Sequence, residues 1–385
     1  MKQRILSIDR MRGINIFLVV FGHFIFFNVK DLNSVQIGVW GTTFRMAMFM
    51  FLCGYIAYKT TPVKIFKRYD QYLLKKARTL LLPFFMWPLV VNTFFFTHTI
   101  DLRSQWMELI SYGGLWFLSY LFFMSLLYSG FLFLSTLYKQ KSILYDVMLV
   151  LVILGLLLIV RQFNPSFNIN YFIFNFLFYF LGVLVSKFKK LNKIFTHNLT
   201  FFIAFVGFMS LVGHYINGDK STLNLTIKLF SAGTATIVFY NIVQRITWNA
   251  FIDKAVKYLG RHSMIIYTTH FYLAPVLITG YFLPTNLKTF PIVLIAASFS
   301  MVIILTCLGI FKIVQLSPLL NLLLYGIRVP ETPIKDIAIQ NAEERQPVIT
   351  IPEREVPGAG IFEREIADLE AKVGAFQHEE PLLER

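Results

Sequence analysis

Long apolar stretches alternate with short polar connections over the first 330 residues of the chain. An apolar stretch of about 17 to 25 residues is long enough to cross a lipid bilayer as an α-helix. Ten such stretches can be delimited, at about residues 13–29, 37–58, 79–97, 114–137, 143–160, 170–186, 198–216, 226–244, 262–283 and 289–314. The pattern predicts an all-α fold, a polytopic transmembrane bundle of about ten helices. An even number of spans puts both termini on one side of the membrane.

Lysine and arginine are spread unequally between the two sets of connections. The connections on the side of the N-terminus hold 21 of them, and those on the other side hold 5. Because short cytoplasmic loops carry the excess of positive charge, we expect both termini in the cytoplasm. The composition, 56% hydrophobic and 15% charged, excludes an ordinary soluble domain. The sequence indicates a multi-pass protein of the cell membrane.

The net charge of +15 combines two parts of opposite sign. Residues 1–330 carry +22 and residues 331–385 carry −7, so a domain boundary lies near Pro330. Cytoplasmic loops that face anionic lipid explain the basic part, so we expect membrane lipids as partners and not nucleic acid. Residues 331–385 are expected to form an acidic, proline-containing cytoplasmic tail with a short amphipathic helix. This tail is either an appendage that the chemistry does not need or a docking element for a partner.

Arg12 and His23 lie eleven residues apart on the first predicted span. Eleven residues turn a helix by three turns plus roughly 20° and rise by about 16 Å, so both side chains share one face. We expect Arg12 at the membrane surface and His23 near the middle of the bilayer, where an ionisable group is a functional candidate. The pair suits a long ligand with an anionic head in water and a reactive end in the membrane. The alternatives are a positive-inside anchor for Arg12 and a packing hydrogen bond for His23.

Arg45 is a second ionisable residue within a span, at a depth comparable to that of His23. Its side chain is too deep to reach the membrane surface easily, so we expect it to face a polar cavity. The two cysteines, Cys53 and Cys307, also fall inside spans. They are expected to be small core residues and not a disulfide or a metal pair.

Five short blocks carry a resemblance to a known family. In chain order they comprise residues 8–13 with 18–23, then 49–55, 75–83 and 114–118, and finally 259–263 with 266–270. Together they resemble acyltransferase family 3, integral membrane O-acyltransferases that include fucose 4-O-acetylases and O-antigen acetylases. The hallmark of that family is an arginine followed, after ten residues, by a histidine. The resemblance covers about residues 5–325.

The resemblance implies transfer of an acyl group, most often acetyl, from acetyl-CoA to a hydroxyl of a cell-surface carbohydrate or lipid-linked sugar. It implies that the reaction needs no metal and takes place in a bacterial inner membrane. It implies a basic cytoplasmic mouth for the phosphates of CoA, and a histidine base, His23, whose pKa near neutrality suits proton transfer. His23 either acts directly on the acceptor or first carries the acyl group. The mouth comprises Arg10, Arg12, Lys75, Lys76 and Arg78. Candidate substrate-binding residues are Trp116, Tyr267 and His270, each of which also has a structural alternative.

The chain departs from the family pattern at three positions. Cys53 stands where the family usually has serine, and Lys75 where a pattern of two arginines starts. Arg45 stands where the closest branch often has histidine. Arginine stays charged and cannot act as a base. We therefore expect Arg45 either to stabilise negative charge during catalysis or to hold an anionic acceptor.

A transporter or flippase for a sugar or lipid is the competing hypothesis, with Arg12, His23 and Arg45 lining a pathway. Against it, the apolar spans lack acidic residues at their centres and the chain has no evident inverted repeat. A third hypothesis is an inactive acyltransferase that serves as a scaffold. The sequence names neither the acceptor nor the oligomeric state.

Overall fold

The computed structural model describes residues 6–29, 35–61, 69–91, 114–137, 142–163, 169–219, 221–275 and 289–328. They belong to the first of two units into which the chain divides, Met1–Val329. The expected tail, residues 331–385, lies outside the described residues. Within the described ranges every regular element is a helix, which confirms the all-α fold class.

Seven of the described helices are long and apolar enough to cross a membrane. They are α1 (Leu6–Asn28), α2 (Gln36–Thr60), α6 (Trp116–Leu137), α7 (Ile143–Phe163), α8 (Ile169–Lys187), α11 (Thr222–Arg245) and α14 (Thr289–Val314). An eighth span is possible if α9 (Lys189–Phe195) and α10 (Asn198–Val212), which meet at a bend of 55°, count as one.

Two of the ten predicted spans run into residues that the structure does not describe. The predicted span 79–97 begins inside a helical run made of α3 (Tyr69–Lys76), a π-helical segment η3 (Ala77–Leu81) and α4 (Leu82–Val91). Pro83, the second residue of α4, has no N–H to donate to the carbonyl oxygen of Thr79 within η3, so the regular α-helical hydrogen bond is missing there. The predicted span 262–283 contains α13 (Ser263–Leu273). The count of ten therefore stays a prediction.

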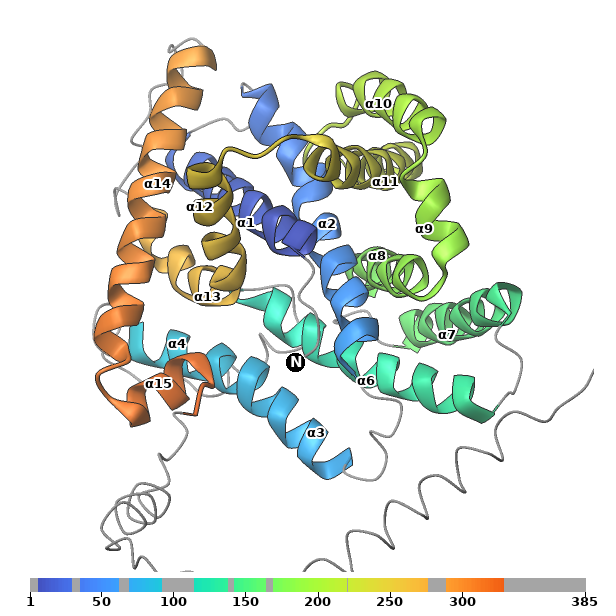
Figure 1. Cartoon of the computed structure of the whole chain (residues 1–385), viewed down its shortest axis with the longest axis horizontal. Helices are drawn as coiled ribbons and strands as arrows, with labels where there is room; N and C mark the ends of the chain where they lie inside the picture. Colours follow the sequence, from blue (N-terminus) through green and yellow to red (C-terminus); the bar gives the residue numbers. More distant parts are fainter. Residues whose placement is uncertain are drawn as a thin grey trace, which may run out of the picture. The chain divides into compact units, whose positions relative to one another are not determined.

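Glycines let two pairs of helices approach closely (Figure 1). On α1, a Cβ added to Gly13 would lie 2.0 Å from the carbonyl oxygen of Val256, which belongs to α12 (Ala250–Arg261). On α2, a Cβ at Gly54 would lie 1.8 Å from a carbonyl oxygen of α8. Small residues at helix crossings are the usual way to pack transmembrane helices backbone to backbone.

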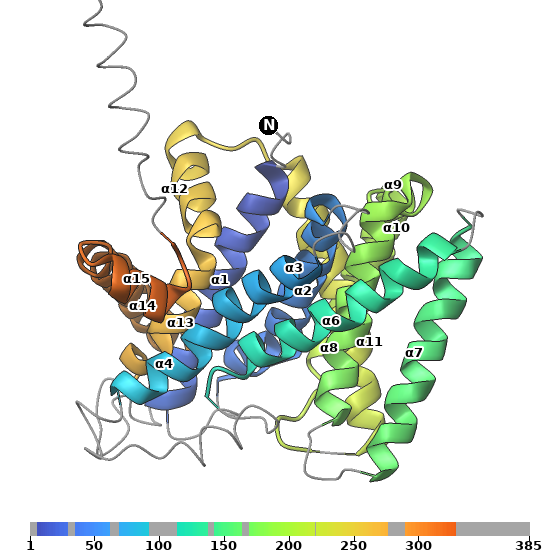
Figure 2. The ribbon, with the colours of Figure 1, turned by 90° about the horizontal axis from the view of Figure 1, so that it is seen from below.

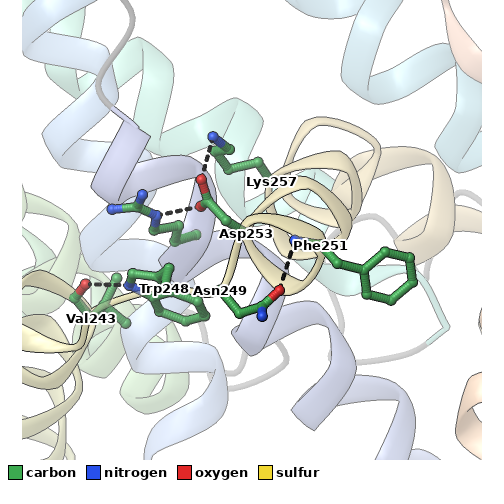
Figure 3. Close-up of polar contacts among 7 residues, drawn as sticks. Val243, Trp248, Asn249, Phe251, Asp253 and Lys257 are labelled. Carbon is green, nitrogen blue, oxygen red and sulfur yellow. Dashed lines mark hydrogen bonds and ion pairs between the residues drawn. The ribbon is translucent and has the colours of Figure 1, made fainter.

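Helix α12 is amphipathic, and an ion-pair cluster attaches it to the start of α1. Arg10 donates a hydrogen bond of 2.6 Å to Asp253, and its guanidinium lies 5.5 Å from the ring centre of Trp248. Lys257 forms a second ion pair of 2.6 Å with Asp253 (Figure 3). Hydrogen bonds from Arg10 and Lys257 lower the pKa of Asp253 to about 2. The sequence pattern predicted this segment only as a basic cytoplasmic connection.

Helix direction divides the unit into two ends, which Figure 2 shows from the side. One pocket is lined by side chains from the C-terminal halves of α1 and α13 and from the N-terminal halves of α2, α6, α8 and α11. These six helix halves therefore lie on the same side of the bundle. We call it the pocket end, and the end where α1 begins the basic end. The remaining described helix, α15 (Pro318–Tyr325), packs against α4.

Candidate active site

A pocket of about 410 Å³ lies at the pocket end of the bundle. Its volume falls within the range of about 300 to 1,000 Å³ that is usual for small-molecule sites. Six helices contribute side chains, together with residues just before α6 and α11. The polar and aromatic lining residues include His23, Thr42, Arg45, Trp116, Tyr171, Asn217, Lys228 and Tyr267. Most of the remaining wall is apolar, so the polar groups converge on a small enclosed volume.

His23 lies five residues before the end of α1, at Asn28, and its ring lines the pocket. The helix begins at Leu6 and not at residue 13, so Arg12 lies within it and His23 lies about 9 Å beyond its midpoint. His23 thus lies in the half of α1 nearer the pocket end, and its expected place near the middle of the bilayer stays a prediction. Behind His23 lies His270 of α13, which is fully buried. The ring centres of the two histidines are 5.0 Å apart.

Hydrogen bonds fix the proton positions of this histidine pair. Nδ1 of His270 lies 3.0 Å and 2.8 Å from the carbonyl oxygens of Ile266 and Tyr267, so this nitrogen must be the donor. In a neutral imidazole Nε2 is then an acceptor. Nε2 of His270 lies 3.1 Å from Nδ1 of His23, which must therefore donate, and which also lies 3.1 Å from the carbonyl oxygen of Val19. Nε2 of His23 is left unprotonated.

The guanidinium of Arg45 lies directly against α1 beside His23. Its Nη1 donates to the carbonyl oxygen of Leu18 over 3.0 Å. A Cβ on Gly22 would fall 0.7 Å from the same Nη1, so only glycine at that position leaves the space that Arg45 occupies. The backbone of Arg45 is tied to α1 as well, because the side-chain amide of Asn15 donates to its carbonyl oxygen over 2.9 Å. Arg45 lines the pocket, whose wall is mostly apolar, so its expected role in a polar cavity stays a prediction.

Aromatic side chains from α6, α8 and α13 form the opposite wall. Trp116 and Tyr171 contact edge to face, with ring centres 5.0 Å apart. Tyr267 lies next to His270 on α13 and also lines the pocket. Gly114, just before α6, has a φ of 47°, a left-handed conformation that suits glycine and turns the chain into the helix. Two of the three predicted substrate-binding residues, Trp116 and Tyr267, thus line the pocket, whereas His270 supports His23 from behind.

At the basic end, the structure brings two of the predicted mouth residues together. Arg12 donates a hydrogen bond of 2.8 Å to the hydroxyl of Ser263, the first residue of α13. Arg12 and Lys76 both lie close enough to Cys53 on α2 to act electrostatically on its thiol. Partial burial lowers the pKa of Lys76. Arg12 lies three helical turns before His23 on α1, and Lys76 is the last residue of α3.

The other three mouth residues do not join this pair. Arg10 is engaged with Asp253 on α12, and Lys75 is exposed. Arg78 lines a second pocket of about 440 Å³ together with Arg328, and its buried Nε has no hydrogen-bond partner among the described residues. Whether any of these residues binds a donor stays a prediction.

Sequence reasoning did not single out Lys228, which the structure brings into the pocket. Lys228 lies on α11, six residues after its first residue Thr222. One available signal was its position inside an apolar span on the side where Lys and Arg are few. No group of three or more His, Cys, Asp or Glu side chains in the described ranges could hold a metal ion.

Comparison with known proteins identifies one match. Residues 5–310 match acyltransferase family 3, described as an acyltransferase domain. Neither a curated protein nor a solved structure matches the chain. The match extends from the start of α1 well into α14, so every helix that lines the pocket lies within it.

Proposed function

This chain belongs to acyltransferase family 3 and is a multi-pass membrane acyltransferase, and we propose that it moves an acetyl group from acetyl-CoA to a hydroxyl of a cell-surface carbohydrate or lipid-linked sugar. The location that fits this reaction is a bacterial inner membrane, with the basic end toward the cytoplasm and the pocket end outward. Acetyl-CoA is made and kept in the cytoplasm, whereas surface glycans are completed outside. The donor then enters at one end of the bundle and the acceptor at the other.

The donor proposal rests on the spacing of charges along α1. Arg12 and Lys76 bind phosphates of CoA at the basic end, and the thioester reaches His23, about 16 Å further along the helix. Asn15 lies between them, and its buried Oδ1 has no hydrogen-bond partner among the described residues. This oxygen is suited to accept a hydrogen bond from an amide N–H of the long CoA arm. A buried acceptor without a partner is costly unless a ligand satisfies it.

The observation that carries the reaction proposal is the free Nε2 of His23 in the pocket beside Arg45. Nε2 takes the proton of the acceptor hydroxyl while that oxygen attacks the carbonyl carbon of the thioester. Arg45 stabilises the negative charge that develops on the carbonyl oxygen. Collapse of the adduct forms the ester, breaks the carbon–sulfur bond and returns the proton from His23 to the CoA thiolate. The competing route, in which Nε2 itself carries the acetyl group, predicts protein labelled by radioactive acetyl-CoA without acceptor.

The decisive experiment measures acetyl-CoA consumption and acceptor acetylation by purified protein in nanodiscs. Loss of the base should make His23→Ala slower by about 10²- to 10⁴-fold, with acetyl-CoA binding retained. His214→Ala is the matched control, because His214 is an exposed histidine that does not line the pocket. Equal activity of wild type and His23→Ala would remove the base assignment. Substrate movement across sealed vesicles without any acetyl-CoA consumption would instead support a transporter.

The donor site has its own test. Arg12→Ala and Lys76→Ala should weaken acetyl-CoA binding, and the affinity of the wild type should fall as salt rises. Lys190→Ala is the control, since Lys190 is exposed near the basic end on α9. If all three variants lose the same affinity, only general surface charge is acting and no defined mouth exists.

A further inference from the structure

Lys228 of α11 places a second cation in the pocket that His23 of α1 and Arg45 of α2 also line. No hydrogen bond or ion pair joins its ammonium to any of the described residues. Its Nζ lies instead near three aromatic rings, 5.4 Å from the ring centre of Tyr171 and 5.5 Å from those of Phe174 and Tyr215. These rings come from α8 and from the segment between α10 and α11, so they fix the ammonium from two sides.

The pocket is unbalanced in charge. Arg45 and Lys228 are both cations, and no Asp or Glu occurs among the residues that line the described pocket. A partly buried lysine inside a transmembrane helix is costly, and aromatic faces recover only part of its lost hydration. Such a cation is retained at low cost when a substrate anion completes its coordination. Arg45 donates to the backbone of α1 beside His23 and is assigned to the reacting carbonyl oxygen, so Lys228 is the cation that this role leaves available for another anionic group.

From this geometry we infer that Lys228 binds an anionic group of the acceptor, and that the acceptor is an acidic sugar carrying a carboxylate or phosphate. The inference rests on the proposed acetyl transfer and narrows its substrate class. An anion held by Lys228 and a hydroxyl held at His23 anchor one sugar at two points across a pocket of about 410 Å³. Trp116 and Tyr171, which line the same pocket, offer ring faces and edges for the sugar itself.

Binding experiments test this inference without relying on turnover. The probes are glucuronic acid and glucose 1-phosphate, with glucose as the neutral control, titrated into full-length protein in nanodiscs. Wild type should bind at least one acidic probe about tenfold or more tightly than glucose, because a charge-assisted contact is worth about that factor. Tighter binding of the uronic acid would point to a carboxylate, and tighter binding of the sugar phosphate would point to a phosphate.

Lys228→Met and Lys228→Arg separate a binding role from a structural one. Methionine keeps the contact with the three rings and removes the charge. It should therefore abolish the preference for the acidic probe and leave glucose binding and the unfolding temperature close to wild type. Arginine keeps the charge and should retain the preference. In turnover, Lys228→Met should raise the half-saturation concentration for acidic acceptors only.

Two results would overturn the inference. One is equal binding of acidic and neutral probes by wild type. The other is a Lys228→Met variant that unfolds at lower temperature with an unchanged preference, which would make Lys228 a structural residue of the aromatic cluster. If wild type acetylates a neutral sugar as well as an acidic one, the inference fails while the proposed function stands. If no acceptor is acetylated although acidic probes bind, the proposed function fails and the anion site stands.

Discussion

Each half of helix α1 contains a glycine, and the two glycines have opposite structural roles. At the basic end, Gly13 brings the helix so close to α12 that a methyl group would meet a backbone carbonyl oxygen at 2.0 Å. At the pocket end, Gly22 opens a space that the guanidinium of Arg45 fills. The first glycine joins two helices, whereas the second makes room for a charged group beside His23. A glycine in a transmembrane helix thus has no single meaning, and what fills the missing side chain's volume decides its role.

This difference is reflected in the chemistry of the two halves. Around Gly13 the contacts are backbone packing and an ion pair, which hold α12 in place. Around Gly22 the contacts are hydrogen bonds to side chains that can act on a substrate, including the His23–His270 pair. The half around Gly13 holds α1 in place against α12, and the half around Gly22 places His23 and Arg45 in the pocket. Substitutions in the first half should change stability, and substitutions in the second should change activity.

The largest effect of this kind is expected at His270. His270→Ala removes one of the two acceptors of the Nδ1–H of His23 and leaves the carbonyl oxygen of Val19 as the other, so the ring is held less firmly in the orientation that presents Nε2 to the pocket. We expect the maximal rate to fall by about 10- to 100-fold, the scale known for the partners that orient metal-bound histidines, with acetyl-CoA affinity unchanged. His270→Gln can still accept the hydrogen bond and should recover part of the rate. Kinetics with both variants decide this, and a full rate in His270→Ala would remove the orienting role.

Gly13→Ala comes next and should act on stability. The added methyl cannot be accommodated by a side-chain rotation, because the opposing atom is the backbone oxygen of Val256. Overpacking of this kind costs about 1 to 3 kcal/mol. Gly155→Ala on α7 is the control, since nothing lies within 4 Å of its added Cβ. Thermal unfolding in detergent should show a lower midpoint for Gly13→Ala and an equal or higher one for Gly155→Ala. Equal midpoints for both would mean that the α1–α12 contact adapts freely.

Gly22→Ala should have the opposite pattern of effects to Gly13→Ala: a smaller loss of stability and a larger loss of activity. Arg45 is a long, flexible side chain, so its guanidinium can move away from the new methyl group. Moving it away from His23 should lower the maximal rate about tenfold, because preorganised charge acts only where it is aimed. The activity assay in nanodiscs and the unfolding midpoint are measured on the same sample, with Gly130→Ala as control on open helix surface. A lower midpoint with full activity would place Gly22 in the same class as Gly13.

The sequence pattern was enough to predict the helices whose character is set by length and hydrophobicity. The expected spans 37–58, 143–160 and 170–186 agree with α2, α7 and α8 to within a few residues. The pattern did not predict that α12 would dock on α1, because an amphipathic sequence indicates a helix with one apolar face but not which neighbour that face packs against.

The candidate site was predicted only in its local part. Arg12 and His23 share a helix, so their spacing could be calculated from helix geometry. The contact between His23 and His270 joins residues 247 positions apart, and the aromatic surroundings of Lys228 come from two separate segments. Such contacts depend on which helices become neighbours, and hydrophobic periodicity carries no information about that choice.

The smallest effect concerns the ion pairs that attach α12 to the half of α1 around Gly13. Arg10 and Lys257 hold the pKa of Asp253 at about 2 in the folded protein, whereas an aspartate in an unfolded chain titrates near 3.9. The folded state therefore favours the carboxylate, and its contribution to stability is present above about pH 4 and is lost as the pH falls toward 2. Asp253→Asn lacks this contribution at every pH. Wild type should unfold at a slightly higher temperature than Asp253→Asn at pH 7, and the gap should close on acidification through that window. A gap that stays constant down to the lowest pH would show that the asparagine disturbs packing against α1, and that charge at Asp253 contributes little to docking α12.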